Sequence, residues 1–211
     1  MNLRPGLAFA AILAAVSPAV PSAALAQGAT TETAAQPVGL PEMAIGSATA
    51  PVTIIEYSSM SCSHCAAFGQ NVFPMLQSKY IDTGKVRFVF REFPLDIKAA
   101  AASILARCIG KDGPDKFFSA VEMMFKLQDQ LMAQTKQTLI YVGKQHGMSE
   151  DEVKTCEEDQ AQFEKLNADQ QFAARQVKIS ATPTFFINGA RFQGAMTYEE
   201  LEARIEPMLR K

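Results

Sequence analysis

Apolar positions along the chain follow two different periods. Residues 52–57 form a short apolar run rich in β-branched side chains, which predicts a buried strand. Residues 86–93 alternate between apolar and polar side chains and predict a second strand, which Pro94 ends. The stretch between the two strands predicts a helix from residue 61 or 62 to about residue 79, and Pro74 should kink it.

The middle of the chain predicts a block of helices. From residue 96 to about residue 157, apolar residues recur at helical spacing. The expected helices are residues 98–109, a helix that starts at Pro114, residues 136–146, and a short helix capped by Ser149 and Glu152. A longer helix over about residues 159–178 leads out of the block.

A hairpin and a last helix complete the pattern. Residues 184–187 predict a strand, and residues 188–189 (Asn-Gly) are a strong signal for a two-residue turn into a return strand at residues 191–193. Residues 197–200 (TYEE) fit a capping box at the start of the last helix. The order is strand, helix, strand, helical block, hairpin and helix, which is an α/β pattern.

The first 26 residues have the features of a secretory signal peptide. One positive charge, Arg4, precedes an apolar stretch over residues 7–16, and a small-residue cleavage pattern ends at Ala26. An uncleaved membrane anchor is the alternative, but this apolar stretch is shorter than a membrane span requires. Cleavage after Ala26 would place the mature chain outside the cytoplasm, where disulfides persist. Residues 27–50, rich in Ala, Thr and Pro, predict a flexible segment with room for one short edge strand.

Composition narrows the class of protein. With 48% apolar and 20% charged residues among 211, the chain can bury one sizeable core and is neither disordered nor a coiled coil. The net charge of −2 leaves no basic excess for binding nucleic acid. Four cysteines are too few for a disulfide scaffold, but two of them, Cys62 and Cys65, lie three positions apart.

Cys62 and Cys65 carry the candidate chemistry. They flank Ser63 and His64, directly after a predicted buried strand and at the start of a predicted helix. A sulfur in the first turn of a helix faces free N–H groups and the positive end of the helix dipole, both of which favour a thiolate. His64 adds a possible cation or donor beside the same sulfur. A stabilised thiolate favours the reduced dithiol, which makes the corresponding disulfide oxidising.

Two other uses of this pair have to be weighed. A zinc site needs further ligands, but Cys108 and Cys156 stand alone and His146 lies too far before Cys156 to form a ligand pair. No metal site is therefore predicted. An inert structural disulfide across so short a loop would gain little stability from closing it.

Two further positions are unusual for their context. Glu56 places a charge inside an apolar strand, where it is either a buried functional acid or an acid of an edge strand that faces water. Pro183 comes directly before an apolar strand, where it would cost a ladder hydrogen bond. The bond from Thr182 to Pro183 is either cis within a tight turn or an ordinary trans bond at the start of a strand.

Taken together, these segments resemble a known family. The strand with Glu56, the C-x-x-C at a helix start and the segment TPTFFING at residues 182–189 resemble a thioredoxin-fold protein. The helical block and the phrases APVTIIEYSSMSCSHC and REFPLD are similar to the DsbA-like branch of secreted thiol–disulfide oxidoreductases. The resemblance extends from about Ala50 to the C-terminus.

The resemblance implies an α/β thioredoxin fold with an inserted helical domain. The thioredoxin-fold domain would comprise residues 51–95 and 158–211, and the insertion residues 96–157. The resemblance implies that Cys62 is the exposed nucleophile, that Cys65 is its buried partner and that His64 stabilises the Cys62 thiolate. It also implies that Glu56 is a buried acid for proton transfer. Pro183 would be a cis-proline against the disulfide, and Thr182 would offer its backbone to an extended substrate. One departure is Ser63, which stands where the best-known oxidases have proline.

The implied function is a periplasmic oxidoreductase that introduces disulfides into reduced exported proteins. It would work as a monomer without a cofactor and be reoxidised by a membrane, quinone-linked (DsbB-like) partner. One alternative is a disulfide isomerase or reductase of the same fold, although the N-terminal segment offers no dimerisation heptads. Another is a Cu(I)-binding protein of copper tolerance, since soft thiolates prefer Cu(I).

The remaining cysteines and two methionines complete the predicted features. In an exported protein the even count favours a structural disulfide between Cys108 and Cys156, with two buried free thiols as the alternative. Met60 precedes the C-x-x-C motif and Met196 follows the hairpin, so both are candidates for an adaptable apolar surface that contacts unfolded substrates.

Overall fold

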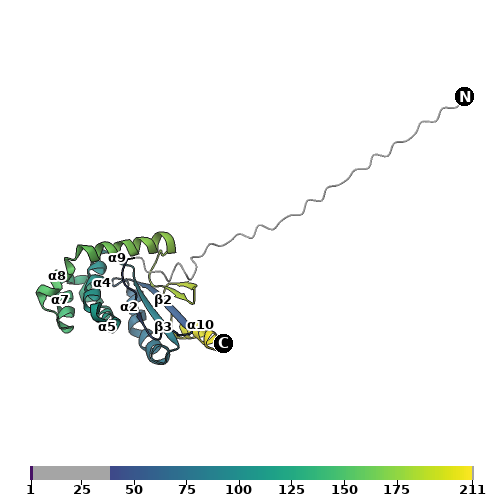
Figure 1. The fold of residues 1–211 in the computed structure, drawn as a ribbon, viewed down its shortest axis with the longest axis horizontal. Helices are drawn as coiled ribbons and strands as arrows, with labels where there is room; N and C mark the ends of the chain where they lie inside the picture. The colour runs from purple at the N-terminus through teal and green to yellow at the C-terminus, as the bar shows by residue number, and fades with distance from the viewer. Residues whose placement is uncertain (2–38, 211) are drawn as a thin grey trace.

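The computed structural model describes Met1 and residues 39–210 (Figure 1). Apart from Met1, the predicted signal peptide therefore lies outside the described residues, as do residues 27–38 of the predicted flexible segment. The described part contains one five-stranded mixed sheet, in the order β1-β3-β2-β4-β5. Its strands are β1 (Met43–Ile45), β2 (Val52–Ser58), β3 (Val86–Glu92), β4 (Thr184–Ile187) and β5 (Ala190–Gln193).

β2 lies at the centre of this sheet, parallel to β3 and antiparallel to β4. Side chains of a strand alternate between its two faces, and both faces of β2 are covered. Ile54 lies in the larger apolar core and Ile55 in a smaller core on the opposite face. Glu56 therefore shares the face of Ile54, with Phe90 and Phe185 as its partners on the neighbouring strands.

Helices cover both faces of the sheet and extend beyond one end of it (Figure 1). The helices of the described residues are α2 (Ser63–Asn71), α3 (Phe73–Leu76), a π-helical turn (Gln77–Ile81), α4 (Ile97–Ile109), a 3-10 turn (Gly110–Asp112), α5 (Pro114–Lys126), α6 (Gln128–Ala133), α7 (Thr135–Gln145), α8 (Glu150–Glu157), α9 (Gln160–Phe172), a second π-helical turn (Ala173–Val177) and α10 (Tyr198–Leu209). The predicted α/β fold with an inserted block of helices is confirmed.

Local signals account for most of these element ends. Ser149 and Thr197 each form the capping box that the sequence predicts, at the starts of α8 and α10. Pro114 is the first residue of α5. The predicted helix over residues 61–79 is interrupted at Val72, just before Pro74, and continues as α3 and a π-helical turn.

The predicted flexible segment over residues 27–50 left room for one short edge strand, and its described part, residues 39–50, contains that strand. Residues 43–45 form β1, which pairs antiparallel with β3 at the edge of the sheet. Leu40 and Met43 are buried in the larger core, and the backbone N–H of Leu40 donates to Asp169 in α9 at 2.9 Å. Arg107 of α4 donates to the carbonyl of Pro41. Burial of two large side chains and these long-range contacts hold a segment whose composition alone suggested a tether.

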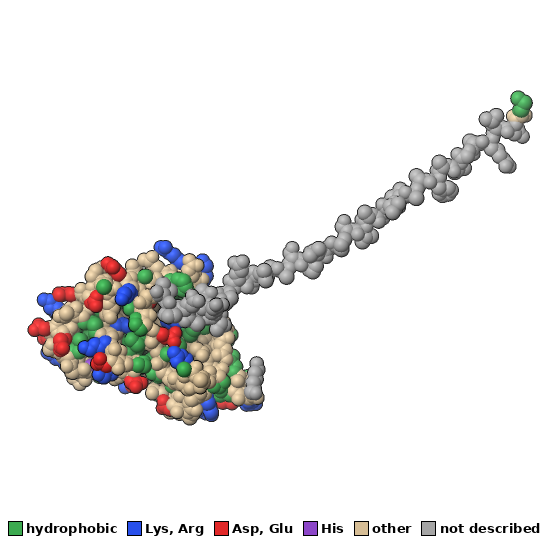
Figure 2. Space-filling view, in the orientation of Figure 1, with side chains coloured by type: hydrophobic (Ala, Val, Ile, Leu, Met, Phe, Trp, Pro, Cys, Tyr) green, Lys and Arg blue, Asp and Glu red, His purple; other side chains and the backbone are tan. Residues whose placement is uncertain are grey.

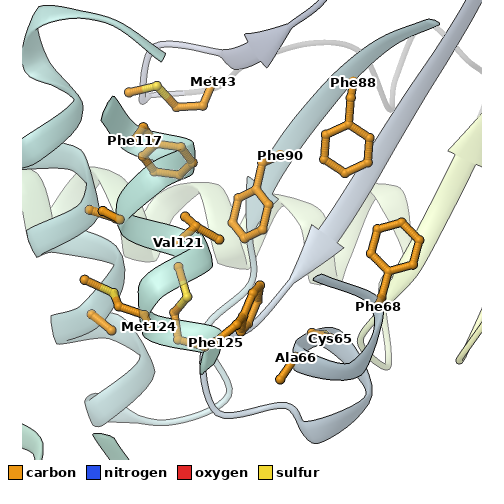
Figure 3. Packing of buried hydrophobic residues seen from close by; sticks show 14 of the residues in the cluster. Met43, Cys65, Ala66, Phe68, Phe88, Phe90, Phe117, Val121, Met124 and Phe125 are labelled. Atoms are coloured by element: carbon orange, nitrogen blue, oxygen red, sulfur yellow. The ribbon is translucent and has the colours of Figure 1, made fainter. Parts of the chain in front are cut away.

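An aromatic cluster joins the sheet to the helical block (Figure 3). Phe88 and Phe90 of β3 face Phe68 of α2 and Phe117 and Phe125 of α5, with ring centroids 5.6 Å apart for Phe90 and Phe117. Each fully buried ring contributes roughly 1.5–3 kcal/mol of hydrophobic stabilisation. The larger core continues without interruption from the strands into α4, α5 and α7, so the inserted helices share one core with the sheet.

A disulfide joins Cys108, near the end of α4, to Cys156 in α8, with Cα atoms 6.3 Å apart. It closes a segment of 48 positions within the helical block.

The surface carries charges of both signs. Figure 2 shows acidic and basic side chains interspersed over the face in view. Within the described residues, no helix combines the length and apolar character that crossing a bilayer requires.

Candidate redox site

Cys62 stands at the junction between β2 and α2. After the strand, a turn closes with the N–H of Cys62 donating to the carbonyl of Ser59 at 3.1 Å. Cys62 is then the N-cap of α2, and its extended backbone lets its sulfur accept a hydrogen bond from the N–H of Cys65 at 3.3 Å. The cysteine thus occupies the position at which a helix has unsatisfied donors.

The second wall of the site comes from the other end of the chain. The Thr182–Pro183 peptide bond is cis, and it precedes β4, which pairs with β2. The sulfur of Cys62 lies 3.3 Å from the carbonyl oxygen of Thr182, to which the thiol donates when it is protonated. The sheet therefore brings together two segments that are 120 positions apart.

The two sulfurs differ strongly in acidity. The pKa of Cys62 is lowered to about 5. The largest cause is a hydrogen bond from the Cys65 thiol, and hydrogen bonds from the Thr182 side chain and from the N–H groups of Cys65 and His64 lower it further. Desolvation of the sulfur acts in the opposite direction. Burial raises the pKa of Cys65, and its hydrogen bond to Cys62 and the charge of Glu56 raise it further. Both cysteines are reduced thiols in this structure, and Cys65 is completely buried. Near neutral pH, Cys62 is thus a thiolate and Cys65 a thiol.

Glu56 lies behind the pair, on the central strand and only 2% exposed. Because β2 has a strand on each side, the alternative of an edge-strand acid facing water is excluded. Burial raises the pKa of Glu56 to about 8; a hydrogen bond with Ser58 opposes this, and the negative charge of Cys62 adds to it. The carboxyl group is therefore mostly protonated near neutral pH, and it can give a proton as well as take one.

His64 contributes through its backbone. Its side chain is exposed, and no hydrogen bond within the described part of the chain joins the imidazole ring to the Cys62 sulfur. The backbone N–H of His64 is among the donors that lower the pKa of Cys62. Any residue other than proline would supply that donor, so the sequence cannot distinguish this role from that of the ring.

Two predictions about exposure are wrong. Met60 is 1% exposed and Met196 is 7% exposed, and both belong to the larger core. Neither can form the apolar contact surface that the sequence suggested, because the turn before α2 directs Met60 inward. Cys62 was expected to be exposed, but it is only 8% exposed.

Sequence reasoning missed three groups that hold the loop before Cys62. Gln128 of α6 donates to the carbonyls of Met60 and Cys62. The hydroxyl of Ser59 accepts from the N–H of Leu95 at 3.3 Å. The Asp96 carboxylate caps α4 and also accepts a hydrogen bond from Ser61. Burial raises the pKa of Asp96, but these hydrogen bonds outweigh burial, and the pKa is lowered overall. These contacts span 35 positions or more along the chain, and only the capping position of Asp96 leaves a local signal.

The described residues contain no group of three or more His, Cys, Asp or Glu side chains that could hold a metal ion. The groups that the fold brings together at this site are the two sulfurs, the carboxyl group of Glu56 and the cis-proline loop.

A sulfur that ionises readily, next to a partner that does not, is the arrangement required for thiol–disulfide exchange. The molecule is in this respect a thioredoxin-fold protein with a dithiol site. The sequence model of the family described as Thioredoxin matches residues 40–207, and the chain belongs to this family.

The relatives extend this finding to the DsbA-like branch. The chain is 35% identical over 152 residues to a protein of Rickettsia bellii named a protein-disulfide oxidoreductase, covering 71% of this chain but 58% of that relative. It is 28% identical over 177 residues to disulfide bond formation protein D of Bacillus subtilis, covering 79% of this chain and 76% of the relative. The crystal structure of alpha-DsbA1 from Wolbachia pipientis superposes with a TM-score of 0.76 at 28% identity, covering 82% of this chain and 94% of the other. The predicted resemblance to DsbA-like proteins is confirmed.

Proposed function

We propose that this protein is a thiol–disulfide oxidoreductase that works in the oxidising direction, introducing disulfides into reduced exported proteins. The observation that carries the proposal is the difference in acidity between Cys62, with a pKa of about 5, and Cys65, with a raised pKa. Stabilisation of one thiolate favours the reduced pair, so that the oxidised pair is a strong acceptor of electrons. The names of the DsbA-like relatives agree with this chemistry.

The proposed reaction begins with the oxidised pair. A substrate thiolate attacks the sulfur of Cys62, a mixed disulfide forms, and Cys65 leaves. The second substrate thiolate then attacks the substrate sulfur of the mixed disulfide and displaces Cys62 as a thiolate. The substrate is oxidised by two electrons, which leave Cys62 and Cys65 reduced. The last step is favoured because the leaving sulfur has the lower pKa.

Glu56 serves the first step. Cys65 leaves as a thiolate in a buried position where its pKa is raised, so it needs a proton at once. Glu56 is mostly protonated near neutral pH and interacts electrostatically with Cys65 once it is ionised, so it is the proposed proton donor. In the reverse reaction the same carboxylate would remove the proton from Cys65.

The loop at Thr182 and Pro183 is the proposed contact for substrate. It lies against Cys62 through the carbonyl of Thr182, directly before the strand β4. An extended peptide can add to such backbone as a short strand and present its own cysteine to Cys62. His64 supports the Cys62 thiolate through its N–H, and Pro183 fixes the shape of the loop.

The proposed location is the periplasm, reached through the signal peptide with cleavage after Ala26 and followed by action as a monomer without a cofactor. A membrane partner linked to quinone, of the DsbB type, would reoxidise the pair. Disulfides persist in such a compartment, and the Cys108–Cys156 disulfide fits it.

The decisive experiment measures the direction of electron flow. The purified protein is equilibrated with glutathione redox buffers, and oxidation of a dithiol peptide is followed in parallel. We expect a more oxidising pair than a typical thioredoxin and peptide oxidation that is lost in Cys62→Ala. Cys65→Ala is the matched control, since its Cys62 thiolate should still attack oxidised glutathione, form a mixed disulfide and release one glutathione thiolate.

Other outcomes would favour the alternatives. Efficient reactivation of scrambled ribonuclease together with a dimeric mass would indicate an isomerase. Stoichiometric binding of Cu(I) by the reduced protein without peptide oxidation would indicate a copper protein. Either result would contradict the oxidising role.

A further inference from the structure

Gln128 is the first residue of α6, and its side chain reaches from the helical block to the redox site. Its amide Nε2 donates to the carbonyl of Met60 at 2.8 Å and to the carbonyl of Cys62 at 3.0 Å. The side chain is half-buried, so these hydrogen bonds are partly shielded from water. One amide thus bonds the backbone at two positions of the segment that carries the reactive sulfur.

The fold fixes the position from which Gln128 acts. α5 ends at Lys126, and Leu127 leaves helical geometry with φ −101° and ψ 19°, so α6 starts anew at Gln128. From the other side, the Gln70 amide in α2 donates to the carbonyl of Phe125 at 2.9 Å. The junction between α5 and α6 is therefore held to the active-site helix by two side-chain amides that point in opposite directions.

α2 and α5 also lie unusually close at this junction. A Cβ atom at Gly69 would come within 2.8 Å of the ring of Phe125. Such close contact leaves the junction little freedom to move away from α2. The donor group of Gln128 is accordingly held in place before any substrate binds.

We infer that Gln128 is a positioning residue that holds the backbone around Cys62 and keeps its sulfur at the N-terminus of α2. The inference deepens the proposed function, since it assigns part of the control of the redox pair to the helical block. The carbonyl of Cys62 already accepts from the N–H of Ala66 at 3.1 Å, and Gln128 supplies its second donor. Both donors offset the partial negative charge of an oxygen that belongs to the same residue as the thiolate.

The carbonyl of Met60 depends on Gln128 even more directly. Among the hydrogen bonds of the described residues, its partner is Gln128. Without that donor the carbonyl would have to turn toward water or another donor, and the segment from Met60 to Cys62 would move with it. The sulfur would then lose alignment with the N–H of Cys65, which it accepts at 3.3 Å.

The experiment uses two substitutions of Gln128 and one control. Gln128→Met keeps the length of the side chain and removes the donor. Gln128→Glu keeps the shape and brings a carboxylate toward two carbonyls. Gln130→Glu makes the same charge change two residues further along α6, at an exposed position. Ionisation of Cys62 in each reduced full-length protein is followed by thiolate absorbance against pH, and the equilibrium constant with glutathione is measured in parallel.

We expect the ionisation of Cys62 to move to higher pH and the oxidising strength to fall. The expected change in the equilibrium constant is about threefold for Gln128→Met and about tenfold or more for Gln128→Glu, since one pKa unit corresponds to a factor of ten. Gln130→Glu should stay within a factor of two of the wild type. A loss of thermal stability alone, with Cys62 titrating as in the wild type, would overturn the inference, as would equal shifts for Gln128→Glu and Gln130→Glu.

The same data separate this inference from the proposed function. If Cys62 of the wild-type protein titrates as an ordinary thiol, the proposed function fails, whatever the variants do. If the wild-type Cys62 ionises at low pH and the Gln128 variants match it, the proposed function stands and the role of Gln128 is refuted.

Discussion

The chemistry of this molecule rests on how one residue is surrounded. Cys62 receives donors from Cys65 and His64 and lies against the carbonyl of Thr182, all within one turn of a helix and one loop. Cys65, three positions on, is fully buried and close to the charge of Glu56. Identical side chains thus acquire opposite tendencies, because hydrogen-bond donors stabilise the thiolate of Cys62, whereas burial is the main factor that disfavours the thiolate of Cys65.

The pKa of Cys62 predicts a pH dependence that differs between the two redox states. Its value of about 5 in the folded protein lies below its ordinary value of 9.0, so the stabilisation is complete above pH 9 and is lost as the pH falls through 5. In the oxidised protein this sulfur does not titrate. Between pH 5 and pH 8 the reduced form should therefore gain stability relative to the oxidised form, by at most about 1.4 kcal/mol per pH unit and less where solvent screens the sulfur. Urea unfolding of both forms at three pH values measures this, and parallel curves would contradict it.

Glu56 predicts the opposite dependence. Its pKa is raised from 4.5 to about 8, so its stabilising contribution is complete below pH 4.5 and is lost as the pH rises through 8. Glu56→Gln should therefore be more stable than the wild type at pH 9, by on the order of 4 kcal/mol, and similar to it near pH 4.5. The same variant should form mixed disulfides with a peptide thiol about 10- to 100-fold more slowly, because Cys65 leaves without its proton donor. If Glu56→Gln gains the expected stability but forms mixed disulfides at the wild-type rate, Glu56 affects stability only and is not the proton donor.

At this scale the sequence predicts the chemistry better than the geometry. The C-x-x-C spacing after an apolar strand identifies Cys62 and Cys65, and a charge inside that strand identifies Glu56. The inward direction of Met60 and the donors of Gln128 depend on elements far along the chain, which no local pattern encodes. Likewise the sequence indicates that His64 acts on Cys62, but it does not indicate that the backbone N–H of His64 is the group that donates to the sulfur.

At the scale of elements, helices with explicit capping signals are predicted closely. α5, α8 and α10 begin where Pro114, Ser149 and Thr197 indicate. β1 and α6 have no such signals. β1 is three residues long, and α6 is six residues long and follows α5 after one non-helical residue. Tertiary contacts stabilise both elements. β1 forms the edge of the sheet next to β3, and α6 contacts the redox site through Gln128.

The contribution of β1 can be tested at Met43. This side chain is 7% exposed and lies above Phe117 in the larger core (Figure 3). Met43→Ala should lower the free energy of unfolding by about 2–4 kcal/mol, because it leaves a cavity between the edge strand and α5. Thr49→Ala, at an exposed position of the same segment, is the matched control and should change it by less than about 0.5 kcal/mol. Equal effects of the two substitutions, measured by chemical denaturation, would show that β1 is not part of the cooperative core.

At the scale of the whole molecule, one continuous core joins the sheet to the helical block. The rings of β3, α2 and α5 lie in the same cluster as side chains of α4 and α7. A buried ion pair between Glu92 at the end of β3 and Arg107 in α4 adds a second link, with Arg107 also bonded to Pro41. Strand and helix patterns could indicate that a helical block is inserted, but they could not show that it shares its core with the domain that receives it.

The Cys108–Cys156 disulfide tests how that block is stabilised independently of the redox site. It closes a segment of 48 positions, and in the chain-entropy model such a loop contributes roughly 4 kcal/mol. The double variant Cys108→Ala/Cys156→Ala should therefore unfold at lower urea concentration by about that free energy, in a single transition because the core is shared. Since neither cysteine of the disulfide is among the groups that set the pKa of Cys62, that pKa should not move. A separate early transition of the helices would show that the shared core does not couple the two parts, and a shift in the Cys62 titration would show that the disulfide acts on the redox pair through the helical block.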